Sequence, residues 1–262
     1  MPKIGIISGS GLYEIKGLII KKRKKITTPF GNPSDEYMIG QIENTEAIFL
    51  PRHGRRHNIP PHMINYRANI WGLKKLGVSR IISVNAVGGI KRGLKPGDIV
   101  MLDQIIDATK NRKSTFYDGK TGVIHIDFTR PYCPEVHRVI LKAGRLSKVP
   151  IKSGGTYVAV EGPRLETASE IRAFGMLGGD VVGMTGMPEA SLARELEICY
   201  SGISVVANYA AGISKGKLTT KEVTDTMLAS TEKIKSLLKQ TFKLLPEQRK
   251  CHCNEALTDT KI

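Results

Sequence analysis

Residues 80–90 read R-I-I-S-V-N-A-V-G-G-I, a β-branched run that ends in one amide and a pair of glycines. The apolar residues predict a buried strand over Arg80–Asn85. Paired glycines at the end of a strand permit a close approach of the backbone, either to a ligand or to another helix. The stretch therefore predicts a core strand whose carboxyl end has a partner of either kind.

Similar runs recur along the chain and alternate with helical patterns. Further strands are expected at Lys3–Ser8, Ala47–Leu50, Thr156–Val160, Val181–Met184 and Gly202–Asn208. Helices are expected at about Pro61–Leu76, Pro134–Ser147, Thr167–Phe174, Pro188–Glu197 and Thr220–Leu244. This alternation predicts an α/β fold in which helices flank a central mixed sheet. We expect one domain over residues 1–245, followed by a polar tail, 246–262, that carries a Cys-x-Cys.

The composition agrees with one globular domain. The 262 residues are 40% hydrophobic and 24% charged, which is ordinary for a protein with a real core. No segment approaches the roughly 20 apolar residues of a membrane span. The first residues lack the long apolar region of a signal peptide. We expect a cytoplasmic protein that does not bind a membrane.

A net charge of +16 raises the possibility of nucleic-acid binding. The densest basic run, Lys21–Lys25, follows two isoleucines and precedes Thr27-Thr28-Pro29, which favours a solvated strand end or loop. No helix-turn-helix, zinc finger or RNA-binding signature accompanies it. An attraction for small anionic substrates accounts for the charge equally well, and no nucleic-acid partner is expected.

Two segments after strands suit an anion. The first, Ser8-Gly9-Ser10-Gly11-Leu12, is able to form a backbone nest with the Ser10 hydroxyl, although a plain tight turn is an alternative. It lacks the third glycine of a dinucleotide fingerprint and the lysine of a P-loop. In the second, Arg52 has the fork to grip a phosphate and His53 adds a donor, the alternative being a solvated basic loop.

Two later turns carry further polar groups. Thr185 has a hydroxyl that is able to complete an anion site. Glu166 lies just before the helix expected from Thr167, so it either faces a ligand or caps that helix.

The ordered motifs resemble those of the trimeric purine nucleoside phosphorylase and methylthioadenosine phosphorylase family. The resemblance covers roughly residues 3–245. Its motifs are S-G-S-G-L, R-H-G-R, N-Y-R-A-N-I-W, N-A-V-G-G, P-G-D-I-V, F-Y-D-G, E-G-P-R, M-T-G-M-P-E and N-Y-A-A-G. It implies the nucleoside phosphorylase fold, with a partly barrel-like sheet, in a homotrimer or a dimer of trimers.

The family cleaves the N-glycosidic bond of purine nucleosides with phosphate, which serves as nucleophile and counter-charge, so no metal or other cofactor is expected. By resemblance, Asn208, Glu166 and His53 are the catalytic residues. The phosphate ligands implied are Ser10, Arg52, His53, the backbone at Ala86, and Thr185. The nucleoside-binding residues implied are Asn85, Met184, Leu165, Glu166, Asn208, Ala210 and Val223, with His125 reaching the 5′ end from a neighbouring subunit.

The base site departs from one branch of the family. Methylthioadenosine phosphorylases carry Asp-x-Asp there, whereas this chain has Asn208 and Ala210. An amide is able to accept a hydrogen bond from protonated N7 and to donate one to a carbonyl O6. Glu166 matches the glutamate that accepts N1–H in 6-oxopurine phosphorylases. The pair predicts inosine, guanosine or 5′-methylthioinosine as substrate, and the apolar residues of the last helix suit the methylthio group.

Three alternatives are weaker. A methylthioadenosine phosphorylase requires Asp at position 208, a hydrolase needs no phosphate site, and a nucleic-acid-binding protein needs a reading element that the sequence lacks.

The chain has the cysteines Cys133, Cys199, Cys251 and Cys253. Cys251-His252-Cys253 lacks the second pair of ligands of a structural zinc site. By resemblance to relatives from hot environments, a Cys133–Cys199 disulfide is expected, with free thiols as the alternative.

Overall fold

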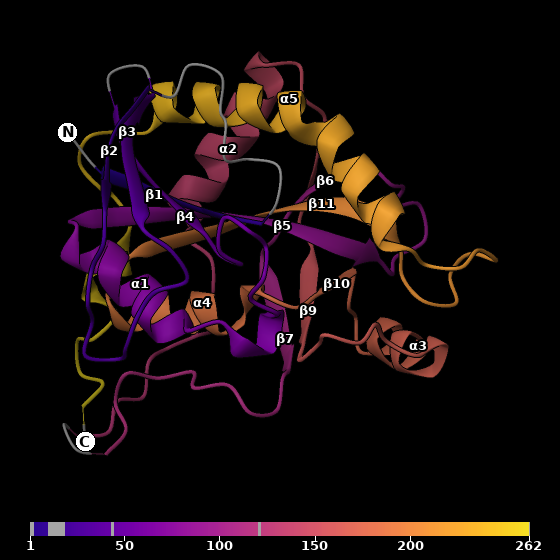
Figure 1. Ribbon diagram of the computed structural model, residues 1–262, viewed down its shortest axis with the longest axis horizontal. Coiled ribbons are helices and arrows are strands. Elements are labelled where there is room, and N and C mark those ends of the chain that lie inside the picture. The colour runs from indigo at the N-terminus through magenta and orange to yellow at the C-terminus, as the bar shows by residue number, and fades with distance from the viewer. Residues whose placement is uncertain (1–2, 10–18, 43–44, 120–121, 262) are drawn as a thin grey trace.

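The computed structural model describes residues 3–9, 19–42, 45–119 and 122–261, and within them an 11-stranded mixed sheet forms the centre of the molecule (Figure 1). The strands are β1 (Lys3–Ser8), β2 (Ile19–Lys24), β3 (Tyr37–Ile42), β4 (Thr45–Pro51), β5 (Val78–Gly89), β6 (Ile99–Met101), β7 (Gln104–Ala108), β8 (Ile151–Ser153), β9 (Thr156–Val160), β10 (Val181–Gly183) and β11 (Cys199–Tyr209).

The long strand β5 joins the parts of the sheet. It is parallel to β1 along Val78–Val84 and parallel to β11 along most of its length. Beyond the end of β1, β10 joins β5 in antiparallel register at Gly88 and Gly89. A Cβ atom on Gly88 would lie 3.3 Å from the Ala210 Cα, so the glycine pair permits a close approach of strands. The α/β class and the mixed sheet are confirmed.

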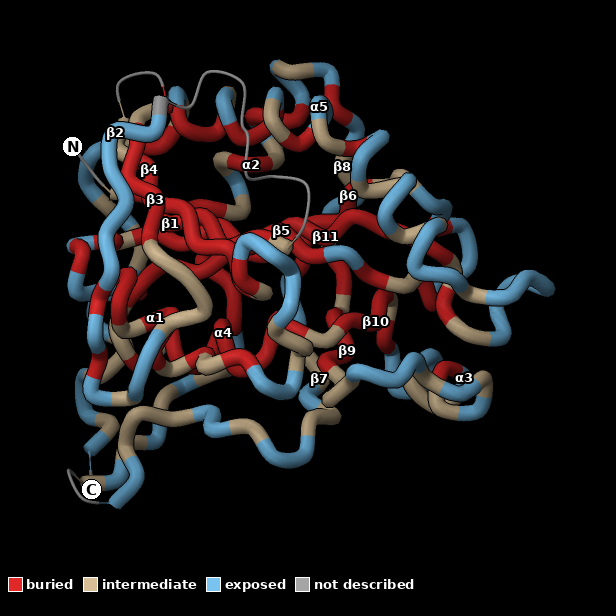
Figure 2. The backbone as a smooth tube through the Cα atoms, viewed as in Figure 1, coloured by how far each residue is buried: buried red, intermediate tan, exposed pale blue. Residues whose placement is uncertain are grey.

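Helices cover both faces of this sheet (Figure 1). They are α1 (Tyr66–Lys75), α2 (Pro134–Leu146), α3 (Ala168–Met176), α4 (Gly186–Glu195) and α5 (Thr220–Leu244), with short 3-10 helices η1 (Pro61–Met63) and η2 (His252–Glu255). Helices α2 and α5 lie on one face and α1 and α4 on the other, while α3 lies beside β9 and β10. Figure 2 shows the resulting core, with buried backbone concentrated in β1, β4, β5 and β11.

The helices expected from the sequence are found, with one correction. The stretch Pro61–Leu76 is two elements, because the Asn65 side chain accepts a hydrogen bond from the Ala68 amide and starts α1 there. Pro60 and Pro61 belong to the preceding 3-10 turn. The side chain at an N-cap satisfies an amide that has no partner within the helix, so Asn65 marks the true start.

The basic run at residues 21–25 is exposed, and Lys21–Lys24 belong to β2 at the edge of the sheet. This confirms the solvated interpretation. Lysines on an edge strand also discourage pairing with another chain. In the described part of the chain, no helix is long and apolar enough to cross a membrane.

Candidate active site

A cavity of about 280 Å³ opens where the parallel strands end, and most of the residues expected to act on a ligand line it. Ser8 is the register partner of Pro51 in β4 and of Val84 in β5, and the Arg52 amide donates to the Ser8 carbonyl at 3.0 Å. The carboxyl ends of β1 and β4 thus lie together beside Val84 of β5, and Val84 lines the cavity. Ligands of open α/β sheets bind at the carboxyl ends of strands.

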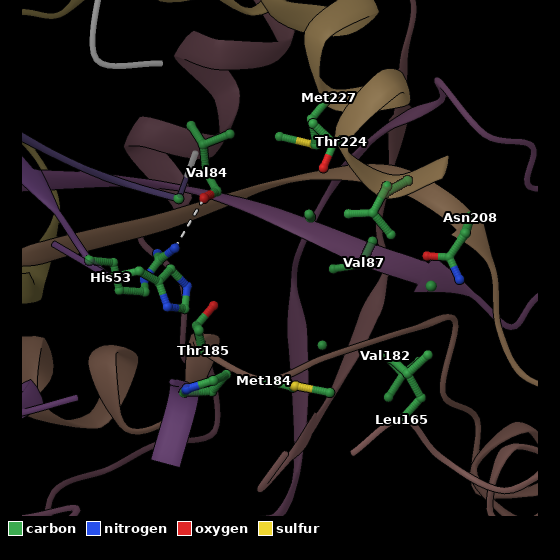
Figure 3. A pocket seen from close by; sticks show the side chains of 18 of the residues that line it. His53, Val84, Val87, Leu165, Val182, Met184, Thr185, Asn208, Thr224 and Met227 are labelled. Atoms are coloured by element: carbon green, nitrogen blue, oxygen red, sulfur yellow. Dashed lines mark hydrogen bonds between the residues drawn. The ribbon is translucent and has the colours of Figure 1, made fainter. Parts of the chain in front are cut away.

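The predicted residues on the cavity wall come from every part of the chain. They are Arg52, His53, Ala86, Leu165, Glu166, Met184, Thr185, Asn208, Ala210 and Val223. Figure 3 shows His53 and Thr185 at one end, Asn208 at the other, and Met227 with Thr224 reaching in from α5. The cavity is therefore elongated, with separate ends for different chemical groups.

Arg52 makes its bidentate contact with protein. Its Nε and Nη2 donate to the two carboxylate oxygens of Glu189, at 2.5 and 3.0 Å. Nη2 also donates to the Ser83 hydroxyl oxygen at 2.6 Å, and Nη1 donates to the Val84 carbonyl. Burial alone lowers the pKa of Arg52, but the adjacent Glu189 carboxylate outweighs it and the pKa is raised. The expected bidentate grip on phosphate is wrong for this arrangement, since only the second N–H of Nη1 is left for a ligand.

His53 is neutral near pH 7 and faces the cavity as an acceptor. Burial and the adjacent Arg52 lower its pKa to about 4. Its Nδ1 lies 2.8 Å from the Ile59 carbonyl, which only accepts, so Nδ1 carries the proton and Nε2 does not. In this tautomer the Nε2 lone pair is the polar group that the ring offers, so the predicted role of His53 as a donor to phosphate stays a prediction.

Thr185 and Ala86 complete this end of the cavity. Ala86 is exposed within an otherwise largely buried strand, which places its backbone at the cavity. The Thr185 hydroxyl donates to Asn85 Oδ1 at 3.2 Å. Asn85 itself is buried behind the wall, so its expected contact with the nucleoside is indirect in this structure.

Asn208 lies at the opposite end with a fixed amide. Its Nδ2 donates to the Tyr209 carbonyl at 2.7 Å. Because a carbonyl oxygen only accepts, this bond assigns the amide nitrogen and leaves Oδ1 on the cavity side (Figure 3). One N–H of Nδ2 is left over, so Asn208 presents an acceptor and a donor side by side.

Glu166 also lines the cavity, and it does not cap a helix. The cap of α3 is Thr167, which forms a capping box with Glu170. Burial, with Glu170 nearby, raises the pKa of Glu166. Leu165 lies beside it on the wall and is 49% exposed. The capping interpretation is therefore wrong, and the carboxylate of Glu166 is left to face the cavity.

The wall between the two ends is apolar. Val223, Met227 and Leu228 of α5 line it, as do Met184 and Ala210. Such a surface holds a hydrophobic substituent better than a hydroxyl.

Some expected residues are not at this cavity. Ser10 lies outside the described residues. His125 is exposed and is not among the residues that line the cavity. Its amide donates to the Thr260 carbonyl at 3.0 Å, so the C-terminal segment holds its backbone. The expected Cys133–Cys199 disulfide is not formed, because all four cysteines are free thiols.

Two charged residues beneath the cavity were not predicted from the sequence as part of the site. Glu189 is fully buried and also accepts hydrogen bonds from Ser83 and Tyr200. Arg112 donates to the carbonyls of Val160, Glu161, Met184 and Met187. A carboxylate in the M-T-G-M-P-E motif was a signal for Glu189, whereas nothing local to Arg112 indicated these four carbonyls, which are 48–75 residues away.

Comparison with known proteins identifies the family. The sequence profile of the Phosphorylase superfamily matches residues 3–243. The chain belongs to that superfamily. The phosphorylase is 50% identical over 263 residues to the 6-oxopurine nucleoside phosphorylase of Pyrococcus furiosus, covering 98% of both chains. It is 52% identical to the probable S-methyl-5′-thioinosine phosphorylase of Thermodesulfovibrio yellowstonii, covering 99% of this chain and 97% of the relative.

A solved structure agrees. The Schistosoma mansoni methylthioadenosine phosphorylase in complex with adenine superposes with a TM-score of 0.94 at 31% identity, covering 100% of this chain and 99% of that one. The phosphorylase is thus a pentosyltransferase of the purine nucleoside phosphorylase family with the nucleoside phosphorylase fold. Its relatives are named for phosphorylases of different purine nucleosides, so the purine base that this chain accepts has to be inferred from the residues of the cavity.

Proposed function

We propose that this phosphorylase cleaves 6-oxopurine nucleosides with inorganic phosphate, releasing the free base and a ribose 1-phosphate. The observation that carries the proposal is the Asn208 amide, whose Nδ2 is committed to the Tyr209 carbonyl. Oδ1 is then available to accept from protonated N7 of the leaving base, and the spare N–H to donate to O6. Stabilising the base as it departs is what lowers the barrier.

Glu166 supports the same base. An ionised carboxylate accepts the N1–H of hypoxanthine or guanine, whereas N1 of adenine has no proton to give. The 6-amino group of adenine would also meet the Asn208 donor. Each buried polar mismatch costs about 1–3 kcal/mol, so two of them discriminate by about 10² to 10⁴.

Phosphate is proposed to lie at the opposite end, between Ala86, Thr185, His53 and the spare N–H of Arg52. The fixed groups there position it beneath the sugar, which is the main requirement when the nucleophile is itself an anion. No metal or cofactor is part of this proposal.

The substrate of the same reaction also differs in its 5′ substituent, which is either a hydroxyl or a methylthio group. The apolar residues Val223, Met227 and Leu228 favour a methylthio group, so 5′-methylthioinosine is a candidate beside inosine.

The deciding experiment compares kcat/KM for inosine, guanosine, 5′-methylthioinosine and 5′-methylthioadenosine, each with and without phosphate. We expect cleavage only with phosphate and a preference for the 6-oxopurines of at least about 10². Equal or better turnover of 5′-methylthioadenosine would overturn the choice of base, and cleavage without phosphate would overturn phosphorolysis.

A further inference from the structure

Four cysteines from distant parts of the sequence converge away from the cavity. The sulfur atoms of Cys133, Cys199, Cys251 and Cys253 all lie within 4.8 Å of one another. Cys133, Cys199 and Cys253 are buried and Cys251 is half-buried. None of the four lines the active-site cavity. The second pair of ligands that the Cys-x-Cys lacks in sequence is therefore supplied by the fold.

Backbone contacts hold the first two cysteines. Cys199 begins β11, and Cys133 precedes α2 and donates its amide to the Tyr200 carbonyl at 2.8 Å.

The C-terminal segment is fixed just before the Cys-x-Cys. Arg249 Nη1 donates to the Glu197 carbonyl at 2.8 Å, and the Lys250 amide donates to Glu135 at 2.6 Å. The four sulfurs are thus brought together by contacts that do not involve sulfur.

The spacing of the sulfurs suits a shared ion. A disulfide joins two sulfurs at about 2.0 Å. Four thiolates at about 2.3 Å from a tetrahedral zinc ion lie about 3.8 Å from one another. The sulfurs of Cys199 and Cys251 are separated by 3.3 Å, and no pair exceeds 4.8 Å. The separations thus lie on either side of the value for four thiolates around one zinc ion, so the sulfurs are close enough to share an ion.

The surroundings of the cluster also suit an anionic centre. Arg80, the register partner of Cys199, is fully buried. Its Nη2 lies 3.4 Å from Glu135, while Nε and Nη1 have no acceptor among the described residues. Four thiolates around one divalent ion carry a net negative charge, which a nearby buried cation with spare N–H donors offsets.

His252 lies between two of the cysteines and is excluded as a ligand. Its side chain is 89% exposed and contacts Glu255 at 2.9 Å. The donor set is therefore four sulfurs.

We propose that Cys133, Cys199, Cys251 and Cys253 bind one Zn²⁺ in a closed tetrahedral site that fastens the C-terminal segment to the sheet. Four soft thiolates in a tetrahedron select zinc. Each thiol releases one proton to solvent when it binds, and no electron is transferred. With every position taken by sulfur, the ion has a structural role.

The test begins with the full-length protein, purified without chelator and analysed for metal by mass spectrometry. We expect about one zinc per chain. The double variant Cys251→Ser/Cys253→Ser is expected to lose at least about nine tenths of the zinc, because it lacks two of the four ligands of a closed site. The matched control His252→Asn alters the residue between them and is expected to retain the zinc.

A second measurement uses only wild-type protein, so it tests the proposal even when the double variant does not fold. Wild-type protein is stripped with a strong chelator under reducing conditions and reloaded with Co²⁺. We expect the visible absorption of tetrahedral cobalt thiolate, a lower Tm in the stripped protein, and recovery of Tm with zinc.

Absence of zinc together with a native mass lower by two or four hydrogens would show disulfides and overturn the proposal. Wild-type protein that holds no zinc with four alkylatable thiols would overturn it as well. Neither readout depends on the substrate, so failure of the zinc site and failure of the proposed function are distinguishable.

Discussion

Asn208 is the residue on which the proposed choice of 6-oxopurines rests, and its orientation makes a substitution informative. Asn208→Asp places a carboxylate oxygen where Nδ2 now donates to the Tyr209 carbonyl at 2.7 Å. The spare donor to O6 is lost as well. One unpaired buried group costs about 1–3 kcal/mol, so we expect kcat/KM for inosine to fall by about 10 to 10². The loss for 5′-methylthioadenosine is expected to be smaller, because its 6-amino group gains an acceptor.

The measurement is the ratio of kcat/KM for the two substrates. Asn32→Asp adds the same charge at an exposed position and is the control. An inosine preference that Asn208→Asp leaves at the wild-type value would remove Asn208 from base recognition.

Glu166 predicts a pH dependence of specificity. Burial raises its pKa, so protonation begins at a higher pH than for an exposed glutamate. The carboxylate accepts N1–H only when ionised, whereas the protonated acid is able to donate to N1 of adenine. As the pH falls through the raised pKa, we therefore expect the inosine preference to decrease, and above that pKa to stay constant.

Steady-state kinetics between pH 4.5 and 8 measure this, the range being set roughly by the ordinary glutamate pKa and neutrality. Glu166→Gln removes the titration, so its preference should be low and independent of pH. A wild-type ratio that does not change with pH would count against Glu166 as the N1 acceptor.

For single residues, the sequence indicated most of the side chains that line the cavity, but not their hydrogen-bond partners or tautomers. Residue types after strands pointed to Arg52, His53, Thr185 and Asn208. The Arg52 guanidinium donates to Glu189, 137 residues away, and this contact depends on tertiary packing. The tautomer of His53 depends likewise on the Ile59 carbonyl, which no motif indicates.

Among the elements, the first turns of α5 carry the proposed preference for a 5′-methylthio group. Met227 lines the cavity from this helix. Met227→Gln keeps the length of the side chain and adds an amide, so the wall suits a methylthio group less. We expect kcat/KM to fall about 10-fold for 5′-methylthioinosine and less for inosine, the size of one lost apolar contact.

Met63→Gln makes the same change at a side chain that is 66% exposed and should affect neither substrate. An equal loss for both substrates in Met227→Gln would place the 5′ end elsewhere.

Arg112 ties β9, β10 and α4 together beneath the cavity. Its side chain is 2% exposed and donates to four carbonyls, including that of Met184 at 2.6 Å. Arg112→Met leaves these carbonyls without a charged donor. We expect a Tm lower by roughly 5 °C, from about 2 kcal/mol in a chain of this size. We also expect KM for the nucleoside to rise about 10-fold, since a displaced Met184 backbone weakens binding by about 1.4 kcal/mol.

Arg112→Lys keeps the charge but not the planar fork, so it should recover only part of both effects. A lower Tm with unchanged KM would limit Arg112 to a structural role.

The elements themselves were predictable in proportion to their hydrophobic pattern. Strongly β-branched strands such as β1 and β9 were predicted with their observed bounds, and so was α5. Strand β2 was not predicted, because it consists mainly of lysine and arginine on an exposed edge. The largely buried strand β3 was not predicted either. Strands β6, β7 and β8 were not predicted either, and β6 and β8 have only three residues each, too few for a period to show.

At the scale of the whole molecule, one chain provides the groups proposed to bind the phosphate and the base, yet its His125 does not line this cavity. The family resemblance assigns that histidine to a neighbouring subunit, which predicts a homotrimer or a dimer of trimers in solution. Light scattering coupled to size exclusion measures the assembly directly. His125→Ala and Asn208→Ala are each expected to lose most of their activity on nucleosides.

Mixing these two variants tests whether a site uses two chains. If His125 acts in the neighbour's cavity, a His125→Ala chain keeps Asn208 and receives an intact His125 from an adjacent Asn208→Ala chain. Random co-assembly in equal amounts then restores roughly one quarter of the sites, because each of the two chains must be of the right kind. If both residues served the same cavity within one chain, no mixed assembly would contain a complete site, and activity would stay at the mean of the two variants. Recovery that requires co-assembly therefore identifies a site shared between subunits.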